Sequence, residues 1–246
     1  FIRVDCRPTN TAVTPPPAPK ATPQVGMVIE PKASLGIGGL LGSATTYEST
    51  GGQTPFTGDF SQGSPQLCGG AAFWPGLAVG PARLGVDINV CSGTPVYGPA
   101  DFEFFRIQRH GIGDVTLSGS TGAVIDALLL GELPTTPVEN FFFSAGVGPT
   151  FRQLNLKLTS DQSFFGGGLP SIGESFWQVG LGLSAGISAQ LCADCVGGNP
   201  LKAGLEGRAR LFSSESLNLT SPAFGFTETA GTGPTMDFSV LLTLGV

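Results

Sequence analysis

Residues 177–191 alternate without interruption between an apolar face and a face of polar or glycine residues. The apolar face carries Trp177, Val179, Leu181, Leu183, Ala185, Ile187, Ala189 and Leu191. A period of two is that of a β-strand with one apolar face. These fifteen residues exceed the roughly 3–10 residues of most strands in globular proteins. A strand tilted by about 45° needs roughly 9–11 residues to cross a membrane, so this segment is long enough to span one.

Three other segments, 82–90, 201–211 and 236–246, alternate in the same way. The whole chain has a positive mean hydropathy of +0.23 and only 12% charged residues. It contains no run of eighteen apolar residues, so a transmembrane helix is not expected. An apolar chain whose hydrophobic residues are spread in alternation is typical of a transmembrane β-barrel, with lipid on the apolar face.

The sequence therefore predicts an all-β fold, an antiparallel up-and-down transmembrane β-barrel of about eight strands, with ten left open. The expected strands are 33–47, 69–79, 82–92, 114–131, 140–158, 175–191, 200–213 and 235–246. Long connections (48–68, 93–113, 159–174 and 214–234) would alternate with short turns, as in bacterial barrels. An even strand number places both ends of the barrel on the short-turn side, which would be the periplasm.

The first part of the chain has a different composition. Residues 14–23 read TPPPAPKATP, which favours an extended, semi-rigid segment. We expect residues 1–32 to form a proline-rich periplasmic tether and residues 33–246 to form the barrel.

Several segments in order resemble the OmpA-like, opacity-type family of eight-stranded outer-membrane barrels. They are GAVIDALLLGELP (122–134), FFFSAGVGPTFRQLNLKL (141–158), SFWQVGLGLSAGIS (175–188) and LKAGLEGRARLF (201–212). The resemblance implies an eight-stranded barrel in the bacterial outer membrane. The chain departs from the family at its end, which reads Leu244-Gly245-Val246 where such barrels usually end in an aromatic residue.

Five cysteines suggest an oxidising compartment. Cys68 and Cys91 flank a hairpin, and we expect them to form a disulfide that clamps the outer loops; two isolated buried thiols are the alternative. For Cys192 and Cys195, in the motif CADC, a disulfide that closes a turn is expected rather than a zinc site, because no second such motif and no nearby histidine accompany them. Cys6 remains over. We expect no cofactor and no metal.

Charged residues on the polar faces should lie inside the barrel. They are Arg83, Asp87, Asp126, Arg152, Lys157, Glu206, Arg208, Arg210 and Asp237. Either they line a pore or they form an interior salt-bridge network. The network is favoured, because an eight-stranded barrel is just wide enough for side chains to fill and an unpaired charge there is costly. The inward glycines Gly180, Gly182 and Gly186 would leave room for a small water path.

The expected function is non-enzymatic: a structural, surface-contact or adhesive barrel. Its expected partners are outer-membrane lipid and other envelope proteins or copies of itself. The net charge of −6 without a basic cluster argues against nucleic-acid binding. His110, the only histidine, has no serine at the spacing of a catalytic pair. The alternatives are a narrow porin-like channel for small solutes and a secreted β-sandwich subunit.

Overall fold

The computed structural model describes residues 27–48, 56–92, 102–109, 113–135, 140–160, 171–196, 199–221 and 226–246. These residues form eleven β-strands joined in one sheet. Within these ranges no helix is long and apolar enough to cross a membrane.

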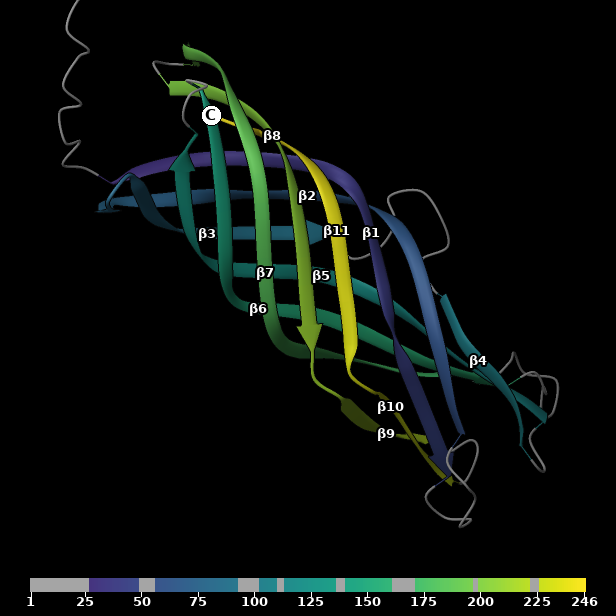
Figure 1. The fold of residues 1–246 in the computed structure, drawn as a ribbon. Helices are drawn as coiled ribbons and strands as arrows, with labels where there is room; N and C mark the ends of the chain where they lie inside the picture. The colour runs from purple at the N-terminus through teal and green to yellow at the C-terminus, as the bar shows by residue number, and fades with distance from the viewer. Residues whose placement is uncertain are drawn as a thin grey trace, which may run out of the picture.

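Eight strands close into an antiparallel barrel (Figure 1). In order around the barrel they are β1 (Val28–Glu48), β2 (Phe56–Val79), β3 (Ala82–Ser92), β5 (Gly113–Pro134), β6 (Phe141–Ser160), β7 (Ser171–Val196), β8 (Asn199–Phe212) and β11 (Thr235–Gly245). The sheet closes because β1 pairs with β2 on one side and with β11 on the other, from Lys32↔Gly245 to Leu41↔Met236. This confirms the predicted up-and-down barrel of eight strands, and a two-layer sandwich is excluded.

Three shorter strands extend the sheet beyond the barrel. β4 (Phe102–Arg109) pairs with β5, while β9 (Glu215–Ser221) and β10 (Phe226–Thr232) form a hairpin that pairs with β1. They lie in segments that the sequence assigns to the long connections 93–113 and 214–234, so that assignment is wrong for these residues. Figure 1 shows all three at the end of the barrel opposite the C-terminus.

The observed strand bounds also correct the predicted ones. The predicted connection 48–68 is largely strand, because β2 begins at Phe56 and pairs with β1 from Thr46↔Phe56 onward. β1 begins at Val28 rather than at Ala33, so the barrel includes residues 28–32 of the predicted tether. Residues 1–26, with Cys6 and the proline-rich stretch, lie outside the described residues.

The two faces of the strands separate as the alternation predicts. Trp177, Val179, Leu181, Leu183 and Ile187 of β7 are all exposed on the outside of the barrel. The same holds on β11, where Met236, Phe238, Val240, Leu242 and Leu244 are exposed. Charged and polar side chains are buried inside. This inside-out distribution is that of a barrel whose outer face meets lipid.

The short turns lie together at one end of the barrel. Gly80 and Pro81 join β2 to β3, and Gly80 adopts a φ of +60°, which glycine accepts without steric cost. Val28, Pro81, Pro134 and Pro200 line one common cavity at this end. The start of β1 therefore lies with the short turns, as expected from an even strand number.

Candidate functional site in the barrel interior

A cluster of buried charges fills the middle of the barrel. We call it the central charge cluster; it consists of Lys32, Asp87, Asp126, Glu206, Arg208, Arg210 and Asp237. These side chains come from β1, β3, β5, β8 and β11. Five different strands therefore contribute to one network inside the lumen.

Asp126 is the centre of this cluster. Its carboxylate accepts hydrogen bonds from Arg208 Nη1 at 2.6 Å, from Arg210 Nε at 2.9 Å and Nη2 at 2.8 Å, and from Thr150 Oγ1 at 2.7 Å. Both arginines are 1% exposed at the side chain, as is Asp126. Charge-assisted bonds of this kind are among the strongest that a protein makes, and burial prevents water from screening them.

The cluster spans the lumen. Arg208 of β8 reaches Asp87 of β3 at 3.2 Å, although four steps around the sheet separate these two strands in an eight-stranded ring. Asp87 also binds Lys32 of β1 at 2.7 Å. The network thus bridges opposite walls of the barrel and crosses the lumen at this level.

Arg152 of β6 lies beside the cluster and is fully buried. Its guanidinium donates to Gln178 Oε1 and to Thr235 Oγ1 at 2.6 Å, and it stacks over the Phe212 ring at 4.0 Å from the centroid. Gln178 in turn donates to Thr232 Oγ1 at 3.1 Å. These contacts tie β6, β7, β8 and the start of β11 together across the lumen.

A second group of charges closes the short-turn end. We call it the mouth ring; it consists of Glu30, Arg83, Glu132 and Lys202. Arg83 contacts Glu30 at 3.0 Å and Glu132 at 2.7 Å, and Lys202 contacts the same two carboxylates at 3.4 Å each. Cations and anions therefore alternate around a closed circuit formed by β1, β3, β5 and β8.

The mouth ring is more open to water than the central cluster. The Arg83 side chain is 32% exposed and lies over the Trp74 ring at 3.8 Å from the centroid. Between the ring and the cluster lies a cavity of about 80 Å³ whose lining includes Glu30, Lys32 and Trp74. Residues of both groups line this cavity, since Glu132 and Lys202 of the ring and Glu206 of the cluster also border it.

The inward glycines do not leave a water path. Leu128 of β5 is 1% exposed, and its Cδ2 lies 3.1 Å from where a Cβ on Gly182 would be. A Cβ on Gly180 would lie 2.8 Å from the Phe212 ring, and one on Gly186 would lie 3.0 Å from Ser144 Oγ. Side chains from neighbouring strands thus fill the space that these glycines provide, which overturns the expectation of a path along them.

The structure places eight of the nine predicted interior charges inside the lumen, but not Lys157. Lys157 is exposed on the outside of β6, whereas Leu154 and Leu156 are each 1% exposed and point inward. β6 pairs with β7 from Phe141 to Thr159 in unbroken register, so faces alternate strictly along it. An odd spacing from Arg152 therefore puts Lys157 on the opposite face.

Sequence reasoning missed Glu30, Lys32, Glu132 and Lys202 as interior site residues. The first two were assigned to the tether and the third to a turn. Lys202 shares the even spacing of Glu206, Arg208 and Arg210 along β8, and that signal was sufficient to find it.

Cys68 and Cys91 are joined by a disulfide, as predicted, but it does not clamp outer loops. The two residues are 2% and 1% exposed inside the lumen, where they pack with Val124 and Leu241. Cys91 lies one residue before the end of β3. Its partner Cys68 lies within β2, which continues from there to Phe56 without pairing to β3. The disulfide therefore fixes the end of β3 to β2 where their ladder stops.

Cys192 and Cys195 form the second disulfide, near the end of β7. No group of three or more His, Cys, Asp or Glu residues within the described ranges could hold a metal ion. His110 lies outside the described residues.

No protein-family model matches the chain, and no curated protein matches its sequence. Among solved structures, Neisserial surface protein A matches at 12% identity and a TM-score of 0.35, over 90% of this chain and 98% of that one. The attachment invasion locus protein Ail of Yersinia pestis matches at 9% identity and a TM-score of 0.28, over 87% and 97%. The outer membrane protease OmpT of Escherichia coli matches at 11% identity and a TM-score of 0.44, over 91% and 97%. Likenesses of this size carry no information about the activity of this chain.

Proposed function

We propose that this protein is a sealed, non-enzymatic barrel of the bacterial outer membrane, with a structural or surface-contact role. The observation that carries the proposal is the central charge cluster. Its ion pairs cross the lumen from Arg208 to Asp87, and with the mouth ring they block the barrel at two levels. A narrow solute channel, the alternative function, would need a continuous wet path between these levels.

The outer surface supports a position in a membrane. On β7 the stretch from Trp177 to Ile187 contains no charged residue and carries exposed apolar side chains, and exposed apolar residues continue beyond it to Leu191 and Val196. Ten residue steps of about 3.3 Å, tilted by about 40°, span roughly 25 Å, so the stretch from Trp177 to Ile187 by itself covers the height of the apolar band on outer-membrane barrels. Trp177 lies near one edge of this band and Phe141 and Phe143 near the other, as expected for aromatic girdles at the two membrane surfaces.

The strand extensions support a surface-contact role. Beyond the barrel, β4 continues the sheet next to β5, and the β9–β10 hairpin continues it next to β1. With the short turns facing the periplasm, these extensions stand outside the cell. They offer backbone edges of the sheet to other envelope proteins or to copies of this chain.

Planar-bilayer conductance tests the sealed lumen. The purified full chain is first incorporated into lipid vesicles, and flotation of the vesicles establishes that it has inserted. We expect no steady unitary conductance when these vesicles fuse with the bilayer. A stable ohmic channel from the inserted, unaltered protein would contradict the proposal and favour the porin-like alternative.

Surface contact is tested separately by chemical cross-linking of intact cells that express the protein. Cross-linked products containing this chain are expected with the full chain, and their loss is expected when residues 214–233 are replaced by a short turn. Replacement of Lys157 with glutamine is the matched control, because this residue is exposed on β6, which does not pair with the hairpin. Products unchanged by the deletion, or none with the full chain, would contradict a contact role for the hairpin.

A further inference from the structure

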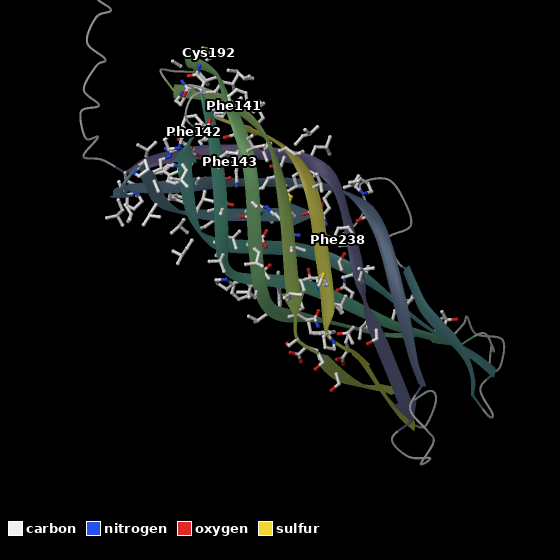
Figure 2. All side chains as sticks on the ribbon, viewed as in Figure 1. Phe141, Phe142, Phe143, Cys192 and Phe238 are labelled. Atoms are coloured by element: carbon white, nitrogen blue, oxygen red, sulfur yellow. A yellow bond between two sulfur atoms is a disulfide. The ribbon has the colours of Figure 1, made fainter. Side chains whose placement is uncertain are left out.

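We propose that the Cys192–Cys195 disulfide is an accessible thiol–disulfide exchange site that accepts electrons from a dithiol while the barrel stays folded. Figure 2 shows Cys192 at the short-turn end of the barrel, near Phe141. In the orientation proposed above, this end faces the periplasm, where dithiol proteins act on disulfides.

The disulfide closes a local bulge and joins no separate elements. Along the β7–β8 ladder, Gln190 pairs with Lys202, Cys192 with Leu201, and Val196 with Asn199. Residues 193–195 of β7 thus stand opposite Pro200 alone. Proline has no N–H to donate to a ladder, which explains why the pairing breaks there. Both cysteines belong to β7, so the bond holds no second strand in place.

The disulfide lies in an exposed part of the chain. Cys195 is exposed, Cys192 is half-buried, and the flanking Leu191 and Val196 are 61% and 47% exposed. Among the described residues, the backbone of residues 193–195 pairs with no strand, so another protein can bind it as an extended segment. An attacking thiolate therefore has access without any opening of the barrel.

The Cys68–Cys91 disulfide provides the contrast within the same chain. It is 1–2% exposed, lies inside the lumen, and receives a hydrogen bond from Arg210 to Cys91 Sγ at 3.5 Å. It also closes a loop with a sequence separation of 23, against 3 for Cys192–Cys195. The buried bond is thus protected and structural, whereas the exposed bond does little to hold the fold.

The exchange is balanced with a dithiol as the reductant. A thiolate of the dithiol attacks Sγ of Cys195, the Cys192–Cys195 bond breaks, and its electron pair leaves on Sγ of Cys192, which takes up a proton. The second thiol of the dithiol then attacks the mixed disulfide and releases Cys195 as a thiol. Two electrons and two protons pass to the protein, and the dithiol becomes a disulfide.

The test uses the full chain, folded in detergent, with Cys6→Ser to remove the fifth thiol. The protein is treated with dithiothreitol, alkylated with N-ethylmaleimide at intervals and mapped by peptide mass spectrometry. Gel mobility without boiling reports at each interval whether the barrel is intact. The matched control carries Cys192→Ser and Cys195→Ser in the same background.

We expect Cys192 and Cys195 to become labelled at least roughly tenfold faster than Cys68 and Cys91, because the buried pair reacts only after the barrel opens. The fast labelling should disappear in the control variant while the gel mobility of the intact barrel is kept. Equal rates for both disulfides, or labelling of Cys192 and Cys195 only as the intact band is lost, would overturn the proposal.

Discussion

Replacement of Asp126 with asparagine should destabilise the barrel by about 3 kcal/mol, because Asp126 is the carboxylate that two buried arginines share. Asparagine has nearly the same shape but no charge, and its amide N–H groups would face the guanidinium N–H groups of Arg208 or Arg210. Removing one partner of a buried ion pair costs about 3–5 kcal/mol. Arg208 keeps Glu206 at 2.7 Å, and Arg210 keeps Asp237 at 3.1 Å, so the loss should fall at the lower end of this range.

The free energy of unfolding is measured by urea titration of the protein in lipid vesicles. The chain has two tryptophans, Trp74 inside the mouth and Trp177 on the outer surface, so fluorescence reports on both faces of the barrel. Lys157→Gln is the matched control; it removes an exposed charge from the outside of β6 and should leave the stability unchanged. Thr150→Val provides an intermediate case, because it removes a single hydrogen bond to Asp126 and should cost about 1–2 kcal/mol.

The result that would refute this reasoning is an Asp126→Asn barrel within about 1 kcal/mol of the unaltered protein. Such a result would mean that water replaces the lost carboxylate contacts, and that the lumen is wetter than the buried network indicates. It would also remove the main support for a sealed barrel. If the variant does not insert, the Thr150→Val measurement still tests the strength of the contacts around Asp126.

Other predictions concern packing, the mouth ring and closure. Leu128→Ala should lower the free energy of unfolding, measured by urea titration, by about 2–5 kcal/mol because it leaves a cavity. Adding Gly182→Ala should recover part of this loss, because its new methyl group points into that cavity. No recovery in the double variant would contradict the contact between Leu128 and position 182. Raising the salt from 0.1 to 1 M shortens the screening length from about 10 to 3 Å, so the half-open mouth ring should loosen. In a Trp177→Phe variant, which leaves Trp74 as the fluorescent tryptophan, added salt should change the fluorescence and leave the urea midpoint of unfolding unchanged. Fluorescence that does not respond to salt would contradict a salt-sensitive ring. In SDS the unboiled protein should migrate differently from the boiled one, and identical mobilities would exclude a closed, detergent-resistant barrel.

The membrane-crossing strands were predictable because lipid imposes a strict pattern on them. β3, β7, β8 and β11 each need an unbroken apolar outer face, and that face is visible in the sequence as alternation. The extended part of β2 was missed for the converse reason. Its residues 61–66 read SQGSPQ and carry no bulky apolar side chain, so no apolar alternation marks them as a strand. The same reason applies to β10, which reads FTETAGT, but not to β4 (FEFFRIQR) or β9 (ESLNLTS), which are short segments with apolar residues inside the predicted long connections.

The inward or outward direction of each side chain could also be predicted wherever a strand has no bulge. Arg208 and Arg210 share a face by their even spacing, and the same rule, applied strictly along β6, places Lys157 outside. At the short-turn end, the alternation predicts fewer of the inward charges. Glu30 and Glu132 lie in residues that the sequence predicts as tether and turn, because β1 and β5 extend further than their apolar alternation indicates.

The sequence by itself determined that the chain forms a barrel and which side chains turn away from lipid, because strand periodicity and the apolar requirement of the membrane are local properties. Only the tertiary structure decided which of the inward charges meet. Asp87 and Arg208 are separated by 121 positions, and their contact exists because β1 closes on β11 and brings β3 and β8 to opposite walls of one narrow lumen. The closed ring also decided which disulfide is hidden and which is exposed, since Cys91 faces the lumen whereas Cys195 lies near the end of β7 at the rim of the barrel.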